Sequence, residues 1–121
     1  MNEIVVADDS ETILGLILVS LKRDGFDPAT AVDGAGAIAQ VREQKPKLLI
    51  VDAMMPNGDG YEVCRLISED PEIEKPYVIM LSAAAQDSDR QRAMEVGVDE
   101  YITKPFSPAE FRRRVKEILR P

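Results

Sequence analysis

The amino-acid sequence predicts an α/β fold, with a single doubly wound (βα)5 domain built on a parallel five-stranded sheet. Short aliphatic runs alternate along the chain with segments of helical periodicity, which is the pattern of repeated strand–helix units. One of these runs, Leu48–Val51, is apolar throughout, as is typical of a central parallel strand covered on both faces. The connections between the runs are short and favour right-handed crossovers. The strand order expected for this arrangement is 2-1-3-4-5, the flavodoxin-like order.

Each predicted strand is an apolar run that ends at polar or turn-forming residues. The first strand ends before Asp8 and Asp9, and the third ends at Asp52. The fourth ends before Ser82, and the short fifth strand leads directly to Lys104. The second run is the weakest of the five. The predicted strands are Glu3–Ala7, Phe26–Ala31, Leu48–Asp52, Tyr77–Leu81 and Asp99–Thr103.

The helices are predicted from their start and stop residues. Gly25 ends the first helix, and Gly97 ends the fourth. Asp59, with Glu62 three positions later, predicts a capping pair at the start of the third helix. Ser107-Pro108-Ala109-Glu110 is a capping box with proline at the first helical position, so it starts the last helix. The predicted helices extend from Glu11 to Asp24, from Asp33-Gly34 to about Gln44, from Asp59 to about Ser68, from Gln86 to Val96 and from Ser107 to about Leu119.

The first predicted helix carries more apolar residues than one sheet-facing stripe needs. Beyond the stripe that begins at Leu14, the residues Ile13, Leu16 and Val19 are also apolar. Two interpretations remain open at this point. The helix is either deeply seated in the domain, or it presents an exposed apolar patch to a partner.

Length and composition limit the possible functions. At 121 residues the chain fits one domain, which we expect to span residues 1–121. The formal net charge of −7 argues against direct binding of nucleic acid or of anionic membrane surfaces. No signal peptide or membrane span is predicted, and the single cysteine, Cys64, suits a reducing cytoplasm, the expected location. The chain contains no histidine, which excludes a Ser-His-Asp triad, a Cys-His pair and any histidine metal site.

Polar residues follow four of the predicted strands and therefore share the carboxyl edge of the parallel sheet. These residues are Asp8, Asp9, Asp52, Ser82 and Lys104. Taken singly, each has an ordinary interpretation as a helix cap, a turn residue or a solvated lysine. Together, the oxygen ligands of the first and third strands suit a hard ion such as Mg²⁺. Such an ion would relieve the repulsion between Asp9 and Asp52 and leave Asp52 able to attack a phosphorus centre.

Over essentially its whole length, the chain resembles the receiver domains of bacterial two-component response regulators. Four segments carry the resemblance, and together they are far more specific than any one of them alone. They are Val6–Ser10, Val51–Pro56 with Gly60 shortly after, Met80–Ala83 and Tyr101–Phe106. The resemblance implies a phospho-accepting signalling switch in a phosphorelay, which catalyses only its own phosphorylation and dephosphorylation.

The resemblance also implies a role for the acidic residues of the sheet edge. Asp52 matches the aspartate that accepts a phosphoryl group from a phosphohistidine of a partner, either a sensor histidine kinase or a histidine phosphotransfer protein. Asp8, Asp9 and Asp52 match Mg²⁺ ligands, with Asp8 acting through water, and Met54 matches a position whose backbone carbonyl is a further ligand. Lys104 matches the lysine that contacts the phosphoryl group.

The switch and its output surface are likewise implied by the resemblance. Ser82 matches the hydroxyl residue that contacts the phosphoryl group and moves toward it, and Tyr101 matches the aromatic residue that then turns inward. The Lys104–Pro105 peptide bond matches one that is cis in the family. The charge order near the last strand and the last two helices resembles a surface through which some receivers form two-fold dimers on phosphorylation. The residues of that surface are Arg90, Glu100, Glu110 and Arg114, and across the two-fold axis Arg90 would meet Glu110 and Arg114 would meet Glu100.

Two other classes of function compete with the switch. A phosphohydrolase of the haloacid-dehalogenase type also uses a strand-end aspartate, but it places an acid–base aspartate two residues further on. Met54 occupies that position here, which argues against such an enzyme. A flavodoxin-like cofactor binder would need a glycine-rich phosphate loop, which the sequence lacks. The complete set of acidic, hydroxyl and lysine residues argues against an inactive, binding-only receiver.

Overall fold

The computed structural model describes residues 2–120, which form five parallel strands and five helices that alternate along the chain. The strands form one sheet in the order β2-β1-β3-β4-β5, so the predicted fold class and strand order are confirmed. The strands are β1 (Ile4–Ala7), β2 (Ala29–Ala31), β3 (Leu48–Asp52), β4 (Tyr77–Ser82) and β5 (Glu100–Thr103). The helices are α1 (Glu11–Arg23), α2 (Gly34–Gln44), α3 (Gly60–Glu69), α4 (Asp87–Glu95) and α5 (Pro108–Leu119).

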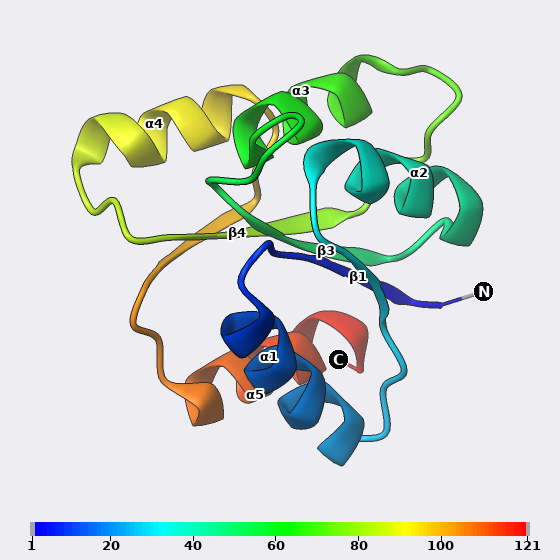
Figure 1. The fold of residues 1–121 in the computed structure, drawn as a ribbon, viewed down its shortest axis with the longest axis vertical. Helices are drawn as coiled ribbons and strands as arrows, with labels where there is room; N and C mark the ends of the chain where they lie inside the picture. Colours follow the sequence, from blue (N-terminus) through cyan, green and yellow to red (C-terminus); the bar gives the residue numbers. More distant parts are fainter. Residues whose placement is uncertain (1, 121) are drawn as a thin grey trace.

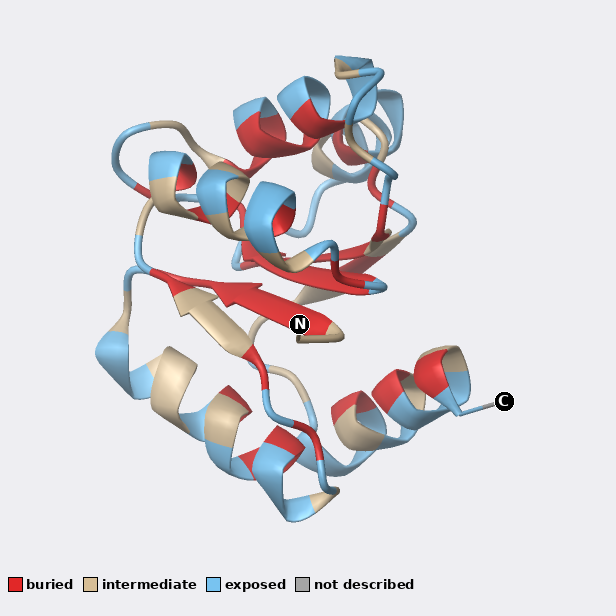
Figure 2. Cartoon of the chain, turned by 90° about the vertical axis from the view of Figure 1, so that its right-hand side faces the viewer, coloured by how far each residue is buried: buried red, intermediate tan, exposed pale blue. Residues whose placement is uncertain are grey.

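Helices cover both faces of the sheet, with α1 and α5 together on one side and α2, α3 and α4 on the other (Figure 1). The position of β3 between the two layers of helices explains why its first four residues are apolar without interruption. Leu48 and Ile50 belong to the core cluster beneath α1 and α5, whereas Leu49 and Val51 belong to the cluster beneath the other three helices. All four side chains are fully buried, so residues 48–51 must be apolar, and only Asp52 at the end of the strand is polar. Figure 2 shows the middle of the sheet as mostly buried.

The second strand is shorter than predicted, because only Ala29–Ala31 of the run Phe26–Ala31 pairs with β1. The backbone N–H of Phe26 donates to the carbonyl of Leu21 at 3.0 Å, which ends helix α1 and removes this group from the ladder. Pro28 has no N–H to donate. The Phe26 side chain packs instead in the core on the α1 and α5 side of the sheet.

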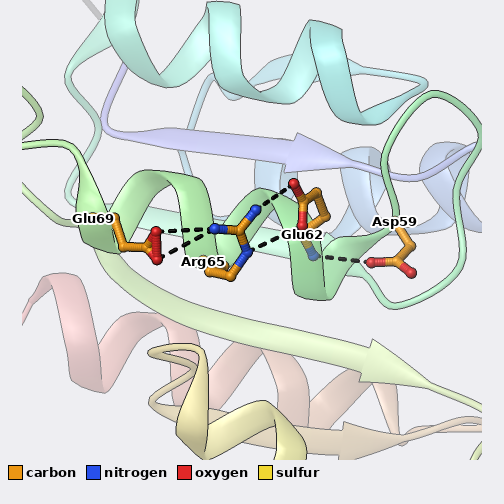
Figure 3. A network of polar contacts seen from close by, with 4 residues as sticks. All are labelled: Asp59, Glu62, Arg65 and Glu69. Atoms are coloured by element: carbon orange, nitrogen blue, oxygen red, sulfur yellow. Dashed lines mark hydrogen bonds and ion pairs between the residues drawn. The ribbon is translucent and has the colours of Figure 1, made fainter.

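Helix α3 starts as predicted at Asp59, but its capping pair forms in one direction only (Figure 3). The Asp59 carboxylate accepts a hydrogen bond from the Glu62 N–H at 2.9 Å. The Glu62 carboxylate does not return to the cap and pairs with Arg65 at 2.6 Å, and Arg65 also pairs with Glu69 at 2.9 Å. This network lies on the exposed side of α3, where ion pairs contribute little to stability.

Helices α1 and α5 are joined by ion pairs at the end of α1. Asp24 accepts hydrogen bonds from Arg112 Nη2 at 2.7 Å and from Arg112 Nε at 3.0 Å, and Lys116 Nζ lies 3.4 Å away. The bidentate contact fits the planar guanidinium. The hydrogen bonds from Arg112, assisted by Lys116, lower the pKa of Asp24 to about 2. Among residues 2–120, no helix is both long and apolar enough to cross a membrane.

We expect Asp24→Asn to lower the melting temperature at neutral pH and to do so less as the pH falls. In the folded protein Asp24 stays ionised down to a pKa of about 2, whereas its ordinary value is 3.8. Its contribution to stability is therefore complete well above pH 3.8 and is lost as the pH falls toward 2. Thermal unfolding of both proteins between neutral and acidic pH measures this difference.

The control variant is Asp27→Asn, since Asp27 is exposed and forms no ion pair within the described part of the chain. This variant should match the wild-type melting temperature at every pH. An Asp24→Asn deficit that stayed constant into the acidic range would contradict the role of the Arg112 pair.

Candidate functional site

The carboxyl ends of the strands meet at one edge of the sheet, and the acidic residues predicted there lie together. Asp8 and Asp9 follow β1, and Asp52 is the last residue of the neighbouring strand β3. Each of the three offers a carboxylate oxygen, and these oxygens all lie within 4.8 Å of one another. Asp8 and Asp52 are buried, at 1% and 7% exposed, whereas Asp9 is exposed.

Lys104 reaches this acidic cluster from the end of β5, two strands away from β3 in the sheet. Its Nζ lies 3.1 Å from Asp52 Oδ1 and 3.5 Å from Asp8 Oδ2. The residue directly follows β5, and its backbone N–H donates to the carbonyl of Ser82 at 2.8 Å. The Lys104–Pro105 peptide bond is cis, as the resemblance implied. One ammonium group thus faces two buried carboxylates.

The electrostatics of the cluster favour a further cation. Burial raises the pKa of Asp52, and the nearby Asp8 carboxylate raises it further, while the hydrogen bond from Lys104 acts in the opposite direction. The net direction is upward, which means that Lys104 does not fully offset the cost of crowding and burial. Additional positive charge at this edge would stabilise the ionised carboxylates.

The donor atoms also fit a hard divalent ion. Asp8 Oδ1 accepts a hydrogen bond from the Ser10 N–H at 2.9 Å. Asp8 Oδ2 is the one buried side-chain oxygen or nitrogen within residues 2–120 that has no hydrogen-bond partner. A carboxylate oxygen that accepts no hydrogen bond, beside two other carboxylates, is the type of ligand set that Mg²⁺ takes. The Met54 side chain is 69% exposed, so a contribution from this residue would come from its backbone.

The two predicted switch residues, Ser82 and Tyr101, are linked through the backbone of Ala84. The Ala84 N–H donates to Ser82 Oγ at 3.0 Å, and the Tyr101 hydroxyl donates to the Ala84 carbonyl at 2.8 Å. Tyr101 is 7% exposed, so the ring lies in the inward position. The resemblance associates the inward position of Tyr101 with the phosphorylated state. In this structure the inward ring occurs while Ser82 still accepts a hydrogen bond from the Ala84 N–H.

Helix α4 buries little apolar surface, and two of its arginines contact tyrosine rings. Its one buried side chain is Ala93. The Arg90 guanidinium lies 5.1 Å from the centre of the Tyr101 ring and donates to the Tyr101 carbonyl at 3.3 Å. The Arg92 guanidinium lies 3.9 Å from the centre of the Tyr61 ring. Burial, together with the neighbouring Tyr101 hydroxyl, raises the pKa of Tyr61 to about 12.

Sequence reasoning did not identify Tyr61 and Arg92 as part of this region. Tyr61 stands at a helical spacing from Cys64, which is the spacing of an ordinary core residue. Arg92 stands in a strongly charged segment that is typical of a solvated helix. Nothing in either pattern indicates that the two side chains stack.

The charged residues of the predicted dimer surface already make contacts within one chain. Arg114 Nε donates to Glu100 Oε1 at 2.6 Å, and the Tyr77 hydroxyl donates to the same oxygen at 3.1 Å. The contact between Arg114 and Glu100 that was expected across a two-fold axis therefore forms inside the monomer. Glu110 is exposed and takes part in no ion pair among the described residues.

Comparisons with known proteins agree with this arrangement. A family model described as the response regulator receiver domain matches residues 4–116. The alkaline phosphatase synthesis transcriptional regulatory protein PhoP of Bacillus subtilis is 42% identical over 119 residues, which are 98% of this chain and 49% of PhoP. The phosphate regulon transcriptional regulatory protein PhoB of Rhizobium meliloti is 39% identical over 120 residues, which are 99% of this chain and 53% of PhoB. The chain thus spans about half the length of these curated relatives.

Solved structures are similar over the whole chain. The BeF3-activated N-terminal receiver domain of Klebsiella pneumoniae RstA is 27% identical, with a TM-score of 0.89. The alignment covers 99% of this chain and 100% of the RstA domain.

We expect Mg²⁺ to raise the melting temperature of the wild-type protein and to have no such effect on Asp9→Ala. An ion that binds the folded state only, at about 100 times its Kd, stabilises a protein by about 2.7 kcal/mol, an increase on the order of 10 °C for a domain of this size. Without Mg²⁺, Asp9→Ala should be at least as stable as the wild type, because the substitution relieves like-charge repulsion.

Melting curves with Mg²⁺ and with a chelator measure both effects. Asp27→Ala serves as the control, because it removes an exposed acid that is not part of the cluster. If Asp9→Ala kept the full stabilisation by Mg²⁺, the ion would bind elsewhere.

Proposed function

Because the chain belongs to the family of response regulator receiver domains, we propose that it is a phospho-accepting switch in which Asp52 is the acceptor. The observation that carries this proposal is the cluster at the sheet edge. Asp52 is buried beside Asp8, and Lys104 contacts both carboxylates. The crowded carboxylates would be stabilised by Mg²⁺, and Lys104 would be available to a phosphoryl group on Asp52.

In the proposed reaction, an oxygen of the Asp52 carboxylate attacks the phosphorus of a phosphohistidine on a partner. The P–O bond forms as the P–N bond breaks, and the electron pair of that bond remains on the imidazole nitrogen, which then takes up a proton. Asp9, Asp52 and the Met54 carbonyl, with Asp8 through water, would hold Mg²⁺, which would supply positive charge against the phosphoryl oxygens. The Lys104 ammonium binds a second phosphoryl oxygen, and the Ser82 hydroxyl donates a hydrogen bond to a third.

The phosphoryl donor lies outside these residues. The 121 residues contain no histidine, so the imidazole must come from a sensor histidine kinase or a histidine phosphotransfer protein. The chain itself turns over no separate substrate. Its only chemistry in this proposal is the formation and hydrolysis of its own aspartyl phosphate.

The signal would pass from Ser82 to Tyr101 through Ala84. When the Ser82 hydroxyl turns to the phosphoryl group, its hydrogen bond from the Ala84 N–H is lost, and the segment that carries the Ala84 carbonyl is free to adjust. Tyr101 donates to that carbonyl and supports Arg90 of α4, so the change reaches the surface made by α4, β5 and α5.

The same surface is the proposed site of a phosphorylation-dependent homodimer. In a two-fold arrangement each contact occurs twice, and Arg90 of one copy would meet Glu110 of the other. Glu100 and Arg114 are already paired within the chain, so they would exchange partners between copies or act as a fixed pair beneath the interface.

We expect Asp52→Asn to abolish labelling by acetyl phosphate in the presence of Mg²⁺, because the amide is not a nucleophile toward phosphorus. Mass spectrometry of the intact protein would detect the added phosphoryl group. Asp27→Asn makes the same chemical change far from the sheet edge and should be labelled at the wild-type rate. Normal labelling of Asp52→Asn would show that another residue is the acceptor.

We expect the protein to be a monomer alone and a dimer when saturated with Mg²⁺ and beryllofluoride, a phosphoryl mimic. Sedimentation velocity measures the change. Glu110→Lys places a like charge opposite Arg90 and should prevent the dimer, whereas Glu117→Lys changes the same helix at a position outside the proposed contacts and should not. If the protein stayed monomeric with beryllofluoride bound, the proposed dimer would be wrong and this face would be an ordinary solvated surface.

A further inference from the structure

The loop between β3 and α3, residues 53–59, is attached to the start of helix α2. The Gly34 N–H donates to the carbonyl of Pro56 at 3.1 Å. A Cβ at Gly34 would overlap the carbonyl oxygen of Gly58, so the two backbones lie in direct contact. Glycine at position 34 is therefore required by the approach of the loop.

A side-chain hydrogen bond joins the same two segments. Asn57 Nδ2 donates to Asp33 Oδ2 at 3.1 Å. The other oxygen of this carboxylate, Asp33 Oδ1, accepts from the Gly36 N–H at 2.7 Å and caps helix α2. Both contacts lower the pKa of Asp33, the cap more than the amide. One carboxylate thus binds the helix start with one oxygen and the loop with the other.

The backbone conformation at position 57 is suited to this contact. Asn57 has φ of 54°, in the left-handed region that asparagine tolerates better than most residues. Gly58 follows with φ of 103°. The pair reverses the chain so that the Asn57 amide faces Asp33.

The near end of the loop is fixed as well. The Ala53 N–H donates to the carbonyl of Leu81 at 2.9 Å, and the Gly60 N–H donates to the carbonyl of Ala53 at 2.9 Å. Met54 lies between this anchored end and the attachment to α2. The position of the Met54 carbonyl therefore depends on both attachments.

We propose that the Asp33–Asn57 hydrogen bond is a positioning contact that holds the Met54 carbonyl in place and so sets the Mg²⁺ affinity of the sheet edge. This inference rests on the proposed function. Neither Asp33 nor Asn57 is a metal ligand; each acts through the loop backbone. Contacts that orient metal ligands commonly change affinity about 10- to 100-fold when they are removed.

A double-mutant cycle tests the contact. Asn57→Gly removes the amide and keeps a residue that adopts positive φ, and Asp33→Ser keeps a helix cap while losing the reach to position 57. We expect Asn57→Gly to raise the Mg²⁺ Kd about tenfold in the wild-type background. In the Asp33→Ser background the same substitution should change the Kd less than about twofold, because the contact is already absent.

Two measurements separate positioning from a general loss of stability. Titration calorimetry gives the Mg²⁺ Kd, and the rate of acetyl phosphate labelling is followed as a function of Mg²⁺ concentration. We expect the Mg²⁺ concentration for half-maximal labelling to rise in Asn57→Gly, while the rate at saturating Mg²⁺ returns to the wild-type value. A lower melting temperature with an unchanged Kd would overturn the inference.

The remaining outcomes distinguish this inference from the proposed function. Equal effects of Asn57→Gly in both backgrounds would show that loop flexibility, not the hydrogen bond, is responsible, and would overturn the positioning role alone. A wild-type protein that binds no Mg²⁺ and is not labelled would overturn the proposed function, and this inference with it.

Discussion

The crowding of carboxylates at the carboxyl edge of the sheet is the constraint on which the rest of the structure depends. Asp8 and Asp52 are buried on adjacent strands, and this burial is tolerable only because Lys104 approaches from the end of β5. A parallel sheet is what brings three such distant positions together, since all its strands end at the same edge. The continuous apolar strands in turn require helices on both faces. The acidic edge, the sheet and its helical layers are thus parts of one arrangement.

The sequence predicted the features that depend on local pattern. The bounds of β3 agree with the prediction because all five of its residues are buried and none could be polar except at the edge. The clustering of Asp8, Asp9, Asp52 and Lys104 followed from topology alone. The shortening of β2 was not predicted, since it depends on where the Phe26 N–H finds its acceptor. The stacking of Arg92 on Tyr61 and the pairing of Arg114 with Glu100 join separate elements, and such contacts leave no periodic signal.

Backbone groups, more than side chains, connect the parts of the edge. Ala84 has no functional group in its side chain, yet its N–H binds Ser82 and its carbonyl binds Tyr101. In the same way, the loop after β3 is fastened to α2 through the Pro56 carbonyl and the Gly34 N–H. A substitution of the Ala84 side chain would therefore leave both of its backbone hydrogen bonds in place, whereas any side chain at Gly34 would overlap the Gly58 carbonyl and disturb the attachment of the loop.

Helix α4 differs from the other helices in what holds it to the sheet. Only Ala93 is buried within α4, and two of its arginines lie over tyrosine rings. Each such cation–π contact contributes about 0.5–1 kcal/mol at an exposed site. A change of about 1.4 kcal/mol alters an equilibrium tenfold. Loss of both contacts would weaken the attachment of α4 by about 1–2 kcal/mol, which changes an equilibrium constant about five- to thirtyfold. A free-energy change of that size at the sheet edge would therefore act more strongly on α4 than on a helix with several buried side chains.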